Sequence, residues 1–348
     1  MNSVVSIIVP TYNAGVDNLA RCIASVLAQS HDNIEVLICD DGSKEECAAA
    51  MDEIASWDSR CRVLHLPHAG VSATRNAGIE ASRGDWLAFV DDDDEVAPYF
   101  VREALEIALR GNADFIAGDV ERPWVGDMPH DWGHESADRS YVLLEDKKQL
   151  DAYRAQYLSF LDSNLKGVPR VLSRGPVVKL YKRSLIDDVR FNPLIAQGED
   201  ALFNFQYLGK CSRIIQAQSI WYRYWQYLSS STHAVNLELR KQGLTAVHTT
   251  SVDSRFINAR RAFEYHLATE GAEMVMKHCE GGFSQRVGET SSALQELSQG
   301  GCFAGLDLRE FAISAYRASL YRLCHQKRYR VAAVAMVLKE KVKGGHLA

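Results

Sequence analysis

One stretch, Gly84–Pro98, constrains this chain more than any other because it places four consecutive aspartates after an apolar run, in the sequence GDWLAFVDDDDEVAP. Trp86–Val90 predicts a buried strand, Asp91–Asp94 follow at its carboxyl end, and Pro98 predicts the start of a helix. Two carboxylates about 6 Å apart repel by about 3 kcal/mol at an effective dielectric constant of about 20. Such a cluster favours a bound cation or a shifted proton.

A hard divalent metal ion is the natural counter-ion for this cluster, since it prefers oxygen ligands and leaves positions open for substrate phosphates. The alternative is a solvated acidic turn that caps the following helix, which is the commoner situation for an isolated run of aspartates. Neighbouring segments favour the metal, because they supply the partners that a metal–diphosphate site needs.

Length and composition indicate an ordinary globular protein. The 348 residues suffice for one large domain, or for one of about 230 residues followed by a smaller helical one. The net charge of −6 gives no overall basic face, so no nucleic-acid partner is expected. The C-terminal segment differs, because from Arg317 onward eight Lys and Arg residues stand against one acid, Glu340.

The eight cysteines form no CxxC pair for zinc or redox chemistry. Cys22 and Cys39 lie within apolar patterns and indicate core positions, so the reducing cytoplasm is the expected location. The first ten residues lack a basic segment and predict a strand, not a signal peptide. Val331–Leu338, the longest apolar run near the end, is too short to span a bilayer.

Four predicted strands recur at spacings of about 23 to 30 residues, with helical patterns between them: Val4–Val9, Ile34–Cys39, Arg62–Leu66 and Asp85–Val90. This spacing is typical of β-α-β units in a parallel sheet. Ligands of such sheets bind beyond the carboxyl ends of the strands. The polar turns after these strands are therefore expected to meet at one edge.

The rest of the chain predicts further elements in this order: a helix over 98–109, a strand over 113–120, a surface loop or lid over 121–145, a helix over 146–161, a strand passing into a short helix over 174–186, a helix over 197–208, and strand-like runs over 213–217 and 219–225. Beyond 236 the pattern is helical to the end. Two domains are expected, 1–235 and 236–348.

The turn after the first strand, Pro10–Gly15, reads PTYNAG. It lacks the GxGxxG pattern with which a dinucleotide-binding unit approaches a pyrophosphate, and it is not a P-loop. Tyr12 could stack on a nucleobase or be an ordinary core or rim tyrosine. Asp41, which ends the second strand, could accept a hydrogen bond from a uracil N3–H or a ribose hydroxyl, or could form a turn and helix cap.

Two other segments offer charged side chains. Arg75 lies one turn inside a helix predicted to begin near Ser72, where it could reach diphosphate oxygens or remain a solvated surface arginine. Glu199 and Asp200 start another helix, where acids commonly favour the helix dipole. Their functional interpretation is a general base, since glycosyl transfer to a hydroxyl needs a carboxylate to remove the proton and a metal to neutralise the leaving diphosphate.

Four segments, taken together and in order from about Val4 to Thr232, resemble glycosyltransferase family 2: VSIIVPTYNAG, ICDDGS, GVSATRNAGIEASRGDWLAFVDDDDEVAP and GPVVKLYKRSLIDDVRFNPLIAQGEDALF. The resemblance implies an α/β GT-A fold, which is Rossmann-like with a mostly parallel sheet flanked by helices, here followed by a C-terminal helical region. It also implies a nucleotide-sugar donor and inversion of the anomeric centre.

The resemblance implies roles for the donor-binding residues. Pro10 and Tyr12 line the base pocket, Asp41 contacts the uridine, and Arg75 lies near the phosphates. The DXD element of the family falls on Asp91–Asp93, with Asp93 as the direct metal ligand and Asp91 or Asp92 near the ribose and the metal.

The resemblance also implies roles near the reacting atoms. Asp200 maps onto the catalytic base, and Glu199 helps to place the acceptor or the base. Lys179, in the run KLYKRSL, belongs to the active-site half and counts among the donor-binding residues. His233 is a candidate for completing the metal shell.

The sequence therefore predicts a metal-dependent inverting glycosyltransferase that uses Mn²⁺ or Mg²⁺. It would move a sugar from a UDP-sugar to a hydroxyl of a saccharide or lipid-linked acceptor, in bacterial surface polysaccharide or glycolipid synthesis. A sugar nucleotidyltransferase would need a glycine-rich basic loop, which PTYNAG does not provide. A glycoside hydrolase could use Asp93 and Asp200 as an acid/base pair, and a nucleotide-binding module on a decayed transferase fold would bind without turnover.

The basic C-terminal segment carries an apolar set consisting of Tyr329, Val331, Val334, Val337 and Leu338. It could lie on an anionic membrane, where lipid-linked acceptors are found, which would make the protein peripheral on the inner membrane face. The alternative is a solvated helix packed on its own domain or on a partner subunit in a homo-oligomer.

Overall fold

The computed structural model describes residues 2–127, 132, 140–163, 165–195, 198–226, 236–298, 301, 303–312 and 314–344. The chain forms two compact units. The first contains Met1–Arg154, Gly167–Pro193 and Glu199–Leu228, and the second contains Ala155–Lys166, Leu194–Gly198 and Ser229–Ala348. The domain boundary predicted after residue 235 borders a segment, 227–235, outside the described residues.

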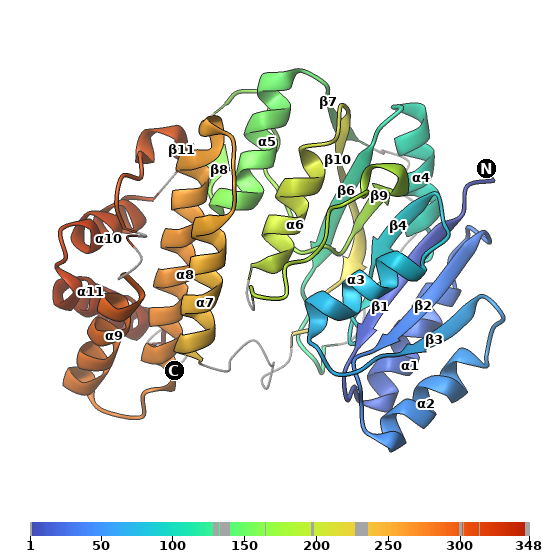
Figure 1. Ribbon diagram of the computed structural model, residues 1–348, viewed down its shortest axis with the longest axis horizontal. Coiled ribbons are helices and arrows are strands. Elements are labelled where there is room, and N and C mark those ends of the chain that lie inside the picture. Colours follow the sequence, from blue (N-terminus) through green and yellow to red (C-terminus); the bar gives the residue numbers. More distant parts are fainter. Residues whose placement is uncertain are drawn as a thin grey trace. The chain divides into compact units, whose positions relative to one another are not determined.

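The first unit is built on a nine-stranded mixed sheet with the order β3-β2-β1-β4-β9-β6-β10-β5, in which β7 also pairs with β10 (Figure 1). The strands are β1 Val5–Thr11, β2 Ile34–Asp40, β3 Cys61–His65, β4 Trp86–Phe89, β5 Glu95–Val96, β6 Phe115–Glu121, β7 Tyr141–Leu144, β9 Lys179–Lys182 and β10 Ile214–Arg223. Strands β1 to β4 run parallel, and β9 lies antiparallel between β4 and β6. The predicted α/β fold class is confirmed.

Two predicted segments differ from the structure. The runs 213–217 and 219–225 form one strand, β10, whose pairing with β6 shifts register between Gln216 and Ile220. The irregular pairing explains why the sequence pattern breaks there. The segment 121–145, predicted as a loop or lid, contains strand β7, while 128–131 and 133–139 lie outside the described residues.

Alternating side chains of the central strands cover the two faces of the sheet. Val5, Ile7 and Val9 of β1 share a buried cluster with α1 (Val16–Leu27), α2 (Glu45–Ala55) and α4 (Phe100–Arg110). Ile8 faces the other way, toward α3 (Val71–Ala81); a Cβ at Gly78 would lie 2.5 Å from its side chain, so glycine permits the close approach of α3. Helix α6 (Glu199–Leu208) covers this same face.

The second unit is mainly helical, with α7 Leu237–Thr249, α8 Ile257–His278, α9 Phe283–Leu297, α10 Ala315–His325 and α11 Tyr329–Gly344 (Figure 1). The predicted C-terminal helical region is confirmed. Helix α5 (Lys147–Ser159) begins in the first unit and ends in the second. A short antiparallel pair joins β8 (Asp162–Ser163) to β11 (Phe311–Ala312), which the sequence did not predict. None of the helices in the described residues has the length and apolar character needed to cross a bilayer.

Candidate active site

The carboxyl ends of neighbouring parallel strands meet at one edge of the sheet. Thr11 of β1 lies beside Asp40 of β2, and Ile8 of β1 lies beside Phe89 of β4. Pro10 is the penultimate residue of β1 and is buried. Because the strands run in the same direction, the polar turns that follow them emerge at this shared edge.

Tyr12 and Asp41 follow β1 and β2 at this edge. The Tyr12 side chain is 50% exposed and stacks on the His68 ring, with 4.4 Å between ring centroids. The Asp41 carboxylate is buried and accepts hydrogen bonds from the backbone N–H groups of Ala69 and Gly70, at 2.8 and 3.0 Å. The Gly70 N–H also lies 3.2 Å from Oδ1, and His68 Nδ1 lies 3.0 Å from Oδ2, so the turn 68–70 already occupies most of the about four acceptor sites of this carboxylate.

Of the four aspartates after β4, Asp94 points into the protein. It is fully buried and accepts hydrogen bonds from the Tyr222 hydroxyl at 2.8 Å and from the Trp225 backbone N–H at 3.0 Å. Burial, together with the charges of Asp91 and Asp93, raises its pKa strongly. Asp94 is therefore a structural group.

Asp91, Asp92 and Asp93 are half-buried at the edge. Burial, with repulsion from the two neighbouring aspartates, raises the pKa of Asp92 to about 7, and burial and Asp91 raise the pKa of Asp93. Since Asp94 is used internally, these three residues are the members of the run whose side chains remain partly exposed at the edge.

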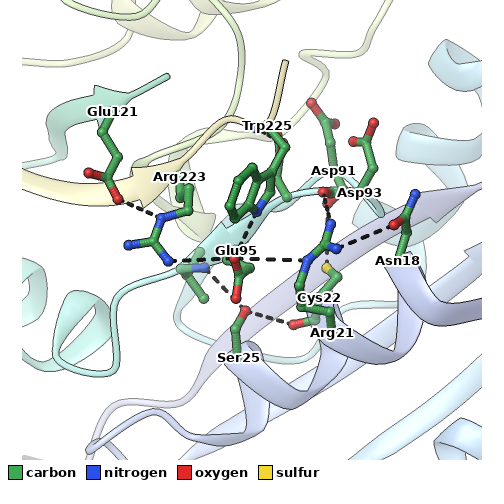
Figure 2. Close-up of polar contacts among 12 residues, drawn as sticks. Asn18, Arg21, Cys22, Ser25, Asp91, Asp93, Glu95, Glu121, Arg223 and Trp225 are labelled. Atoms are coloured by element: carbon green, nitrogen blue, oxygen red, sulfur yellow. Dashed lines mark hydrogen bonds and ion pairs between the residues drawn. The ribbon is translucent and has the colours of Figure 1, made fainter. Parts of the chain in front are cut away.

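Helix α1 holds the backbone of this aspartate loop (Figure 2). Arg21 Nη2 donates to the Asp93 carbonyl at 2.8 Å, and Cys22 Sγ donates to the Asp91 carbonyl at 3.4 Å. The sequence pattern indicated only a core position for Cys22 and did not single out Arg21. The contacts join residues about 70 positions apart, so no local pattern signals them.

Glu95, the residue after the four aspartates, ties the loop to β10 (Figure 2). Its carboxylate accepts from Trp225 Nε1 at 2.7 Å and lies 3.6 Å from Arg223 Nη1. Arg223 Nε in turn donates to Glu121 at 2.6 Å. The sequence pattern did not predict this support either.

Arg75 joins the aspartate loop to the acidic pair. Its Nη2 donates to Asp91 Oδ1 at 3.0 Å, and its Nη1 donates to Glu199 Oε1 at 3.1 Å. The side chain is buried, which rules out the solvated surface arginine. The guanidinium thus lies between the two sets of acids that the sequence singled out.

Glu199 and Asp200 form the first turn of α6. The preceding Gly198 has φ 85°, a conformation that favours glycine. Burial, with the charge of Asp200, raises the pKa of Glu199 to about 7. Burial also raises the pKa of Asp200, although Arg75 and Lys179 oppose the shift. A carboxylate with a raised pKa, once ionised, is a stronger proton acceptor than an exposed one.

Lys179 of β9 is fully buried beneath the acidic pair. Its Nζ donates to three backbone carbonyls, those of Ser173, Gly175 and Val177, at 3.0, 2.6 and 3.0 Å. A Cβ at Gly175 would lie 3.6 Å from Asp200 Oδ2, so this segment runs directly beside Asp200. Lys179 is predicted among the donor-binding residues, and in the structure its amine contacts these backbone carbonyls.

Asn204 of α6 fastens the same segment to the acidic pair. Its Nδ2 donates to the carbonyls of Arg174 and Asp200 at 3.1 and 2.9 Å, and its Oδ1 accepts from the Tyr181 hydroxyl at 2.7 Å. Asn204 lies one helical turn after Asp200. A polar residue on the buried face of α6 was therefore the sequence feature that could have indicated its positioning role.

The donor set at the edge fits a hard divalent ion that also takes substrate oxygens. Within the described part of the chain, no three His, Cys, Asp or Glu side chains are grouped to enclose a metal. Mg²⁺ and similar ions commonly bind one or two protein carboxylates and complete their coordination with phosphate oxygens and water. Asp91 and Asp93 can provide the two carboxylates. His233, the other candidate ligand, lies outside the described residues.

Comparisons with known proteins agree on one family. The model of glycosyl transferase family 2 matches residues 6–186. The putative glycosyltransferase EpsH of Bacillus subtilis is 29% identical over 253 residues, which cover 71% of this chain and 68% of EpsH. The uncharacterized glycosyltransferase EpsJ of the same bacterium is 29% identical over 251 residues, 70% of this chain and 68% of EpsJ.

Among solved structures, S. aureus TarS 1–349 in complex with UDP-GlcNAc matches with a TM-score of 0.59 and 15% sequence identity, over 98% of this chain and 92% of that chain. Together with the sheet topology, this likeness shows the predicted GT-A fold. The family model covers more than half of the sequence, so the chain belongs to glycosyltransferase family 2. It is a glycosyltransferase, as the sequence predicted.

Proposed function

We propose that this enzyme transfers a sugar from a UDP-sugar to a hydroxyl of a saccharide or lipid-linked acceptor, with inversion at the anomeric carbon. The observation that carries the proposal is the bridge from Asp91 through Arg75 to Glu199. It gathers two acidic sets around one buried guanidinium. A leaving diphosphate and an attacking hydroxyl need such groups close together.

In the proposed donor site, Pro10 and Tyr12 contact the nucleobase, Asp41 contacts the uridine, and Asp91 or Asp92 contacts the ribose. Tyr12 offers the aromatic surface that stacking requires, because half of its side chain is exposed. TarS, which has the same fold, binds UDP-GlcNAc, and this supports a UDP-linked donor.

Asp93, with Asp91 beside it, would hold Mn²⁺ or Mg²⁺. The bound ion would neutralise negative charge on the departing diphosphate. Arg21 and Cys22 fix the backbone of both aspartates, so these carboxylates are presented from a rigid loop.

Asp200 is the proposed base, and Glu199 helps to place the acceptor. In a single displacement the acceptor oxygen forms a bond to the anomeric carbon, the bond to the diphosphate breaks, and the acceptor proton passes to Asp200. We assign Lys179 a positioning role, in which its amine and Asn204 hold segment 173–177 against Asp200.

Calorimetric titration of UDP, with and without Mn²⁺, tests the donor assignment. Metal-dependent binding of UDP supports it. If the folded protein does not bind UDP but binds GDP, CMP or dTDP, the donor is a sugar linked to that other nucleotide. Binding of UDP without turnover of any donor in a UDP-sugar panel would favour the decayed binding module. Metal-independent cleavage of a glycoside without a nucleotide would favour a hydrolase.

Synthesis of bacterial surface polysaccharide or glycolipid, with a peripheral membrane contact through α11, stays a prediction. Val331 and Leu338 of this helix are 44% and 49% exposed, whereas Val337 is buried. Flotation with anionic vesicles, using the full chain and one truncated before Tyr329, tests the contact. Equal flotation of both chains would exclude α11 as the contact.

A further inference from the structure

The second unit contains a cavity of about 240 Å³ that the proposed transfer reaction does not use. Its walls come from the end of α5 and from α8, α10 and α11. At about 30 Å³ per molecule of liquid water, the space equals about eight waters. Such a cavity is large enough for one small ring-shaped molecule.

The charges in the wall are balanced, with three acidic and three basic side chains. Glu273 and Lys277 lie one turn apart on α8, yet within the described residues neither takes part in an ion pair. Lys339 Nζ lies 4.1 Å from the ring centroid of Tyr316. Equal numbers of opposite charges disfavour a phosphate or a carboxylate ligand, and so much polarity disfavours an acyl chain.

Tyr316 presents an unused donor. Its hydroxyl oxygen is buried and has no hydrogen-bond partner among the described residues. Burial, with the charges of Glu273 and other acidic groups, raises its pKa to about 12, so the hydroxyl keeps its proton. Tyr265, also in the wall, already donates to the Arg317 carbonyl at 3.3 Å.

An aromatic stack completes the wall. The rings of Phe160 and His266 lie 4.2 Å apart with an interplanar angle of 16°. Ring carbons beside polar donors and acceptors are a lining expected of a small-molecule site. Sugar hydroxyls both donate and accept, so they can bond carboxylates, ammonium groups and a phenol at once.

We infer that this cavity binds one neutral saccharide unit, either alone or as part of a longer glycan. The inference goes beyond the proposed transfer reaction and stands without it, because it rests only on residues of the second unit. A cavity that holds only water is the competing explanation.

Methionine methyl groups report on this cavity directly. Met276 and Met336 line it, whereas Met51 is buried in the first unit. The full chain, labelled with ¹³C at the methionine methyls, is titrated with methyl β-glucoside, methyl N-acetyl-β-glucosaminide and cellobiose. At least one sugar should shift the Met276 and Met336 signals and leave Met51 unchanged. No shift with any of these sugars, or a shift with inorganic phosphate instead, would overturn the inference.

Two variants then test the polar groups. Tyr316→Phe and Glu273→Gln should each lower the affinity for the sugar that binds by about three- to tenfold, which is the usual effect of losing one hydrogen bond. Tyr329→Phe and Glu289→Gln, which lie outside the cavity wall, are the matched controls and should bind normally. Unchanged affinity in both test variants would also overturn the inference. UDP titration of the same samples keeps this outcome separate from a failure of the donor site.

Discussion

The Arg75 guanidinium and the Glu199 carboxylate lie 3.1 Å apart, although 124 positions separate them in the chain. The same guanidinium contacts Asp91 at 3.0 Å, and its Nε has no hydrogen-bond partner among the described residues. The sequence predicted Arg75 near the donor phosphates. Its position between Asp91 and Glu199 makes it the electrostatic link between the aspartate loop and the acidic pair Glu199–Asp200.

Replacing Arg75 by methionine should destabilise the fold. Asp91 and Glu199 would lose their shared positive partner, and an uncompensated buried charge costs about 3 kcal/mol or more. Urea denaturation measures the change in the free energy of unfolding. Arg190→Met is the matched control, because Arg190 pairs with the exposed Glu80 and should lose less than about 1 kcal/mol. Equal small losses in the two variants would contradict the linking role.

Asp93→Asn and Asp94→Asn should have opposite consequences, although the residues are adjacent. Asp93→Asn should abolish metal-dependent UDP binding with little change in stability, since the Arg21 contact uses the Asp93 carbonyl. Asp94→Asn should cost about 1–3 kcal/mol of stability, because the two oxygens of the buried carboxyl group accept from Tyr222 and Trp225, and the amide nitrogen of Asn cannot accept from the Tyr222 hydroxyl. Calorimetry and urea denaturation on both variants check this. If Asp94→Asn alone removed UDP binding while the protein stayed stable, the assignment of the DXD element to Asp91–Asp93 would be wrong.

Asp200→Asn should lower kcat by about 10²- to 10⁴-fold, the usual contribution of a general base, while UDP binding is retained. The measurement is turnover of whichever UDP-sugar the panel identifies, with UDP release as the readout. Glu199→Gln serves for comparison and should act mainly on KM for the acceptor. Full activity in Asp200→Asn would remove it from the mechanism.

The parallel strands β1 to β4 and the edge where the polar turns gather were predictable, because both follow from local apolar patterns and from the spacing of β-α-β units. Tyr12, Asp41 and the aspartate run each follow a strand directly, so their placement needed no long-range information. The four aspartates look equivalent in sequence. Only the contacts of Asp94 with Tyr222 and Trp225 set it apart from the other three.

The support of the site was not predictable from local sequence. Glu95 and Trp225 are 130 positions apart in the chain. Arg21 donates to the backbone carbonyl of Asp93, and since every residue has such a carbonyl, the residue type at 93 does not predict this contact. Lys179 illustrates the same limit. Its place in the run KLYKRSL suggested the active-site half, but only the fold shows that its amine contacts three carbonyls beside Asp200.

The acid side of the pH profile should report on Asp200 and Lys179 together. The proposed base works only when deprotonated, and burial raises the pKa of Asp200, so kcat/KM should begin to fall at a higher pH than for an exposed aspartate. Burial lowers the pKa of Lys179 to about 7, so its ammonium is charged throughout this acid range. That charge lowers the pKa of Asp200.

Lys179→Met removes the charge, so the acid limb should move to higher pH and the loss of rate should be larger at pH 6 than at pH 9. Lys182→Met, on the same strand but partly exposed and paired with Asp114, is the control and should keep the wild-type profile. A Lys179→Met profile parallel to that of the wild type at every pH would mean that Lys179 holds the backbone without tuning the base.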